Sequence, residues 1–149
     1  MSDLTWTDKD FENMCWHDNH VHAMRIEEGE YGSGKLVLDI DHITEWCESE
    51  DGYEFQVVPA ELTFHEVTGL RVTLDYATLT AALGPFSIAS IEREQQQKER
   101  YVTQVWKILI NWPYGEIEFE ANGYIQKGKA PPVLSKNQWL TPERRGSSA

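Results

Sequence analysis

The stretch Tyr101-Val-Thr-Gln-Val-Trp-Lys-Ile-Leu-Ile-Asn-Trp112-Pro-Tyr-Gly115-Glu-Ile-Glu-Phe-Glu-Ala121 decides the fold, because it carries the strongest secondary-structure signal in the chain. Apolar side chains recur at alternate positions on both sides of Pro113, at Trp106, Ile108 and Ile110 before it and at Ile117 and Phe119 after it. A period of two places such side chains on one face of a strand. With turn residues between the two runs, the pattern predicts an antiparallel hairpin.

Shorter runs with the same alternation precede this hairpin, at 20–27, 35–46, 53–58, 62–64, 70–76 and 86–91, and a last strand is expected after the turn Asn122-Gly123. The glycine-rich segment 29–34 should join the first two runs as a second hairpin, because glycine accepts the positive φ of tight turns. Many short strands with one apolar face are typical of antiparallel sheets. We therefore expect a mainly β fold, an antiparallel β-sandwich or a partly closed β-barrel, with at most one short helix.

Four segments are expected to interrupt the strands. Pro59 should break a hydrogen-bonded ladder because it has no backbone N–H, and Thr68-Gly69 should form a turn. Residues 77–83 suit a short helix or a loop. The run Glu92 to Arg100 holds no apolar side chain, so we expect a solvated loop there.

The length of 149 residues is that of one domain, so we expect a single domain over 1–149. Within it, 1–15 should be an irregular lead-in or hold a short helical turn, and 141–149 should be a flexible polar tail. The N-terminus has no basic segment followed by an apolar one, and no apolar run reaches the roughly 20 residues that cross a bilayer. Cys15 and Cys47 have no metal or redox spacing. These features predict a cytoplasmic protein with free thiols.

The chain is strongly acidic. Lys and Arg number 13 against 25 Asp and Glu, which gives a formal net charge of -12. Such a field repels phosphate backbones and anionic lipids, so we expect neither nucleic-acid nor membrane binding. This charge favours a basic protein as the partner. The alternative interpretation is that the acidity only keeps the protein soluble.

Three histidines and a carboxylate lie close together in the sequence, at His17, Asp18, His20 and His22. Residues i and i+2 of a strand project to the same side, so His20 and His22 could ligate a metal together with Asp39 and Asp41. The alternation of the strands argues against a joint site. His20 and His22 fall on the same face of their strand as Met24 and Ile26, whereas Asp39 and Asp41 fall on the face opposite to Leu36, Leu38 and Ile40. If both apolar faces point inward, the two pairs point apart. We therefore expect no metal and no cofactor, and the metal site stays an alternative.

No other segment spells a catalytic signature. The chain has no G-x-S-x-G element and no complete phosphate-binding loop. Glu116, Glu118 and Glu120 alternate as the solvated face of a strand does, where a carboxyl pKa is not raised for acid–base catalysis. Aromatic residues are abundant, and Trp112 with Tyr114 at the hairpin tip are the ones we expect on a surface. The binding candidates are thus His17, Asp18, His20, His22, Trp112 and Tyr114, with no catalytic residue.

Several strings resemble a family of small uncharacterised bacterial proteins. They are Trp16-His17-Asp18, the run Gly34 to Ile43, the run Val58 to Phe64 and the run Gly115 to Phe119. The resemblance covers most of the chain and implies no activity. In size and acidity the chain is also loosely similar to β-rich immunity proteins of bacterial toxin systems. This is a general analogy and not a residue-level match.

Two classes of function remain open. In the first, the chain is a non-catalytic acidic binding protein, an immunity-like inhibitor of a basic protein being one such case. In the second, it is a small β-barrel metal-dependent enzyme or a ligand carrier that uses His20 and His22. The first is preferred, because the sequence spells no catalytic signature.

Overall fold

The computed structural model describes residues 4–50, 52–77 and 83–145. In chain order its elements are β1 (Thr5–Thr7), the 3-10 helix η1 (Asp8–Asn13), β2 (His20–Glu28), β3 (Gly34–Ser49), β4 (Gly52–Leu74), β5 (Phe86–Gln97), β6 (Val102–Trp112), β7 (Gly115–Glu120), β8 (Gly123–Gly128) and β9 (Val133–Ser135). The predicted mainly β fold is confirmed, and η1 is the one helical element of the described residues. No helix in that part of the chain is long and apolar enough to cross a membrane.

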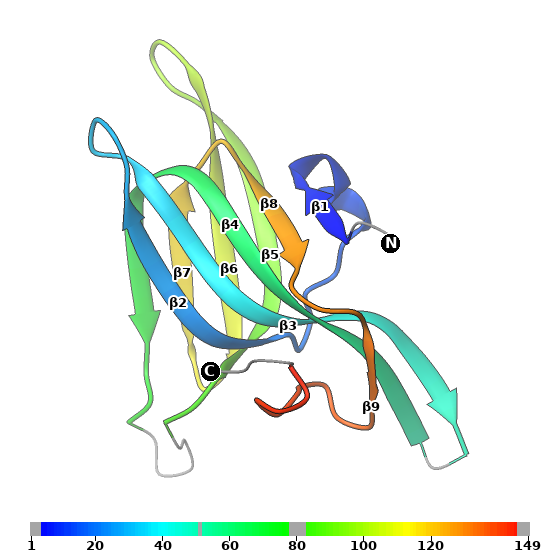
Figure 1. The fold of residues 1–149 in the computed structure, drawn as a ribbon. Helices are drawn as coiled ribbons and strands as arrows, with labels where there is room; N and C mark the ends of the chain where they lie inside the picture. The colour runs from blue at the N-terminus through cyan, green and yellow to red at the C-terminus, as the bar shows by residue number, and fades with distance from the viewer. Residues whose placement is uncertain (1–3, 51, 78–82, 146–149) are drawn as a thin grey trace.

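The strands form one antiparallel sheet that curves back on itself (Figure 1). Its order runs β4, β3, β2, β5, β6 and β7, and β7 pairs with β4 again, which closes a ring. The join between β2 and β5 is narrow, since it consists of the pairs His20–Ser87 and Val21–Phe86. Strands β8 and β9 pair with other parts of β4, and β1 pairs with β8. The predicted hairpin of residues 101–121 is confirmed as β6 and β7, with Trp106 opposite Phe119.

The main core fills the ring with large side chains. Its aromatic centre has edge-to-face contacts, with ring centroids 4.7 Å apart for Phe64 and Phe119 and 5.3 Å apart for Phe64 and Trp106. Such arrangements match the quadrupoles of the rings. The Trp106 indole donates a hydrogen bond to the Ala121 carbonyl at 3.1 Å, so this buried N–H is satisfied. A second, smaller core of Ile43, Phe55, Val57 and Leu140 lies apart from the first.

Strand β4 is continuous over 23 residues, so two predicted interruptions are wrong. Pro59 pairs with Asp41 of β3, and its carbonyl accepts from the backbone of Lys129 on the other side. In an antiparallel strand the N–H and C=O of one residue point to the same neighbouring strand, so the N–H that Pro59 lacks would face the side of Lys129. On that side Pro59 lies between the part of β4 that pairs with β8 and the part that pairs with β9. Thr68-Gly69 lies at a register shift within β4 and is not a turn. Gly69 has φ 63°, the left-handed conformation that glycine accepts most easily.

The expected loop from Glu92 is also wrong. Strand β5 continues to Gln97, which pairs with Val102 of β6. Arg93 still packs on the core, with its guanidinium 4.5 Å from the ring centroid of Phe11. The rest of this segment is polar and mostly exposed, so it leaves no apolar period in the sequence. Of the predicted helix or loop at 77–83, residues 78–82 lie outside the described residues.

Both ends of the described chain make contacts with the rest of the fold. The lead-in forms β1 and η1, and the hydroxyl of Thr7 caps the helix while the Asp10 carboxylate accepts from the Thr7 N–H at 2.9 Å. This is a capping box, which fixes the start of a helix. In the expected tail, residues 141–144 are exposed, whereas Arg145 is only 8% exposed and contacts β3. Residues 146–149 lie outside the described part.

Candidate functional site

Histidines and aspartates lie on the same outer face of the β2–β3 pair, so the prediction that they point apart is wrong. His20 is directly opposite Asp41, whereas Val21 is opposite Ile40 and points into the core. His22 is the extra residue of a β-bulge, because the pairing passes from Val21–Ile40 to Ala23–Asp39. An inserted residue shifts the alternation by one position. The bulge therefore places His22 on the outer face and returns Met24 to the core side.

Asp41 is fully buried at the centre of this cluster and is well compensated. Its Oδ2 lies 2.6 Å from His22 Nε2 and 2.8 Å from the backbone nitrogen of Leu140. Its Oδ1 accepts from the guanidinium of Arg145, which also contacts Asp39. Lys129 Nζ lies 3.4 Å from the same Asp39 carboxylate. These contacts hold residues 140–145 against β3, and we call this set the Asp41 cluster.

The two histidines of β2 have lowered pKa values. Desolvation by burial lowers the pKa of His22, and the nearby Arg145 charge lowers it further. Burial also lowers the pKa of His20, whose ring lies over Trp139 with centroids 5.0 Å apart. Because the Asp41 carboxylate only accepts, His22 carries its proton on Nε2 and donates. The contact is a hydrogen bond from the His22 ring, and Arg145 supplies a positive charge that also faces Asp41.

The metal alternative requires His20, His22, Asp39 and Asp41 to face a common ion. In the structure the guanidinium of Arg145 stands between the two aspartates instead and supplies the cationic partner. Within residues 4–50, 52–77 and 83–145, no group of three or more His, Cys, Asp or Glu side chains could hold a metal ion. The geometry thus gives the cluster a role in docking the C-terminal segment.

Asp18 joins three parts of the chain. It has φ 63°, and its carboxylate accepts from Asn111 at 2.8 Å and from Gln138 at 2.9 Å. His17 Nε2 lies 3.3 Å from the same group and is more than half exposed. Asp18 therefore ties the start of β2 to the end of β6 and to the C-terminal segment. Its observed contacts are structural, and a binding role for His17 and Asp18 stays a prediction.

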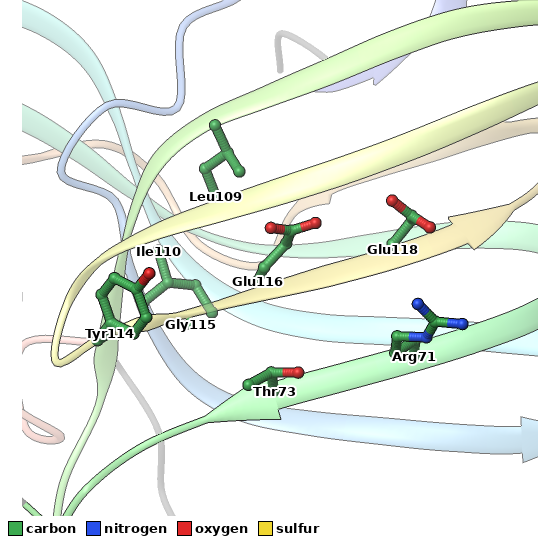
Figure 2. A pocket seen from close by; sticks show the side chains of 8 residues that line it. All are labelled: Arg71, Thr73, Leu109, Ile110, Tyr114, Gly115, Glu116 and Glu118. Carbon is green, nitrogen blue, oxygen red and sulfur yellow. The ribbon is translucent and has the colours of Figure 1, made fainter.

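Trp112 and Tyr114 lie at the surface, as expected, and Tyr114 is 72% exposed. Tyr114 lines a shallow cavity of about 440 Å³ on the outside of β4, β6 and β7, shown in Figure 2. Glu116 and Glu118 lie along β7 and Arg71 on β4 in that view. Both glutamates are also 3.6 Å from Lys107 Nζ. The cavity is therefore of mixed charge, and its carboxylates are already compensated.

Sequence reasoning overlooked a different surface. The end of β3, residues 44–49, and the start of β4, residues 52–55, extend beyond the ring (Figure 1), and with Glu50 we call them the arm. Trp46 and Tyr53 are exposed there by 46% and 55%, and their rings form a T-shaped pair with centroids 6.5 Å apart. Trp46 also packs on Phe55 at 4.9 Å. The available signal was charge, because residues 36–70 contain nine Asp and Glu and no Lys or Arg.

At the base of the arm a buried histidine is fixed in one protonation state. Asn19 Oδ1 accepts from the Ile43 N–H at 3.3 Å, so its amide nitrogen donates to His42 Nδ1 at 2.8 Å. His42 Nδ1 must then be unprotonated. Burial accordingly lowers the pKa of His42 to about 4. Trp6 of β1 contacts this ring edge-on, with centroids 5.1 Å apart.

No protein-family model, curated protein or solved structure matches this chain. The resemblance to small uncharacterised bacterial proteins therefore stays a prediction.

Proposed function

We propose that the chain is a non-catalytic acidic binding protein that engages a basic protein partner through its arm. The observation that carries the proposal is the combination of exposed Trp46 and Tyr53 with the glutamates of the arm, Glu45, Glu48, Glu50 and Glu54, and with no basic residue there. An immunity-like inhibitor, which covers the positive surface of another protein, belongs to this class. The cytoplasm is the proposed location.

Charge and aromatic rings contribute differently to such binding. A negative surface steers a positive partner and raises the association rate in a salt-dependent manner. Large aromatic side chains supply most of the affinity once they are covered, because they bury much area at a small entropic cost. The arm presents both on one element.

The positions of the basic residues support the same surface. Arg145 and Lys129 face Asp39, Arg25 faces Glu27, and Lys107 faces two glutamates of β7. These ion pairs lie on the ring and the C-terminal segment. The arm has no basic residue of its own, so no lysine or arginine within it offsets the charge of its glutamates.

The experiment is affinity capture from the native host with wild-type protein, followed by reconstitution with the purified captured protein. We expect a partner of basic isoelectric point whose association rate falls steeply with added salt. Tyr53→Ser should weaken reconstituted binding by about ten-fold or more, as removal of an aromatic interface residue does. Tyr101→Ser is the matched control, because it removes a tyrosine of similar exposure, 58%, from the β5–β6 tip and should leave affinity within about two-fold.

An acidic partner, or equal effects of the two substitutions, would contradict the proposal. Binding that is independent of salt would remove the role of the charged segment.

A further inference from the structure

A cavity of about 520 Å³ lies at the base of the arm, between the N-terminal segment and β3. Its lining includes Trp6, Asp10, His42 and Glu45, and it contains no lysine or arginine. Three other cavities on the described surface each include a basic side chain, namely Arg71, Arg93 or Lys35. The cavity at the arm therefore combines carboxylates and aromatic rings without internal compensation.

The local structure holds these groups in place. The Asp10 carboxylate is fixed by the Thr7 N–H within the capping box. At the cavity the pairing of β3 with β4 has a register shift between Ile43 and Glu45, which places Glu45 opposite Gln56. His42 is neutral near pH 7, because its pKa is lowered to about 4 by burial, so its ring adds an aromatic wall without positive charge.

We propose that this cavity binds the guanidinium group of an arginine side chain of the partner protein. The inference rests on the proposed function for its source of ligand. A guanidinium is planar and weakly hydrated, stacks on aromatic rings and forms charge-assisted hydrogen bonds with carboxylates. Trp6, Asp10 and Glu45 offer both kinds of contact in one cavity of a size typical for small ligands.

The site is tested with short peptides and the full chain, without the partner. Acetyl-Gly-Arg-Gly-amide is titrated while the indole N–H signal of Trp6 is followed by NMR, and the neutral isostere with citrulline in place of arginine is the ligand control. We expect saturable shifts with a Kd of about 1 mM, as suits a few contacts of one side chain. The citrulline peptide should bind about ten-fold more weakly or not at all.

Two variants distinguish binding of the arginine peptide at this cavity from general electrostatic attraction to the acidic protein. Glu45→Gln should weaken the arginine peptide by about five-fold, because one charge-assisted contact is lost. Glu99→Gln removes the same charge from an exposed position at the β5–β6 tip and should change the Kd by less than about two-fold. Equal effects of the two variants, an unmoved Trp6 signal, or equal binding of a lysine peptide would overturn the proposal.

These results are distinguishable from failure of the proposed function. If a basic partner is captured through the arm but the peptide leaves Trp6 unmoved, the cavity assignment fails alone. If the peptide binds as expected while the captured partner is acidic, the proposed function fails and the cation site stands.

Discussion

Replacement of Asp41 by asparagine is the sharpest test of the structure. Asp41→Asn keeps the size of the side chain and removes its charge, and it also turns one of two acceptor oxygens into a donor. The carboxylate accepts from His22, from the Leu140 backbone and from Arg145. An amide can satisfy donors on only one side, so at least one buried donor loses its acceptor.

The magnitude follows from the burial of both charges. Asp41 has no exposed surface and Arg145 is 8% exposed, so neither charge can return to water without undocking the segment. Removing one partner of a buried ion pair costs about 3–5 kcal/mol, and asparagine retains part of the hydrogen bonding, so we expect about 3 kcal/mol. With an m-value of about 2 kcal/mol/M, the urea midpoint should fall by about 1.5 M.

The assay is urea denaturation of Asp41→Asn, Arg145→Met and the double variant. If the two side chains stabilise each other, the double variant should lose at least about 1 kcal/mol less than the sum of the single losses. Asp39→Asn is the control, because Asp39 is partly exposed, and it should cost about 1 kcal/mol or less. Hydrogen exchange at the Leu140 amide gives a local measurement, since Asp41→Asn should reduce its protection.

The reasoning would be refuted by a midpoint shift of Asp41→Asn below about 0.5 M together with unchanged protection of Leu140. Additive losses in the double variant would show that Arg145 is not the partner that stabilises Asp41.

Two further predictions concern single positions. His42 has its pKa lowered to about 4 by burial, so the unfolded chain takes up a proton near pH 6.5 before the folded chain does. The stability that neutral His42 contributes is therefore complete above about pH 6.5 and is lost as the pH falls toward 4. Between about pH 7 and pH 4.5, the free energy of unfolding of the wild type, measured by urea denaturation, should fall by about 2 kcal/mol more than that of His42→Gln. Gly115→Ala would place a methyl group against the backbone carbonyl of Thr73 and should cost about 2 kcal/mol in thermal unfolding. Gly84→Ala meets nothing within 4 Å and should stay within about 0.5 kcal/mol, and equal losses for the two alanines would contradict the contact with Thr73.

Local periodicity predicted strands well wherever one face is buried in the ring. Leu36, Leu38 and Ile40 alternate in the sequence and all lie in the core. It was wrong at Glu92 to Gln97, where the hairpin leaves the core and burial no longer selects apolar residues at alternate positions. Pro59 was misread for a related reason, because a proline breaks a ladder only if its missing N–H faces a strand, and the sequence does not say which strand that is.

The candidate site was less accessible to sequence reasoning. His20, His22, Asp39 and Asp41 were identified as a group, yet their faces were assigned on the assumption of an unbroken register. Trp46 was visible only as one of several tryptophans, since exposure depends on how far β3 and β4 extend past the ring. The acidic run 36–70 could have been found from the sequence, because charged residues can be counted without knowledge of the fold.

The sequence by itself determined the strand-rich fold, the hairpin around Pro113 and the acidity of the molecule, because alternation, turn chemistry and charge are properties of neighbouring residues. Only the tertiary structure decided what His22 and Asp41 do. One inserted residue in β2 reverses the face of His22, and Arg145, 104 residues away from Asp41, supplies the charge that allows the carboxylate to be buried. Neither the bulge nor the ion pair produces a pattern among neighbouring residues. A bulge is defined by pairing with another strand, and this ion pair forms only because the folded chain brings two distant residues together.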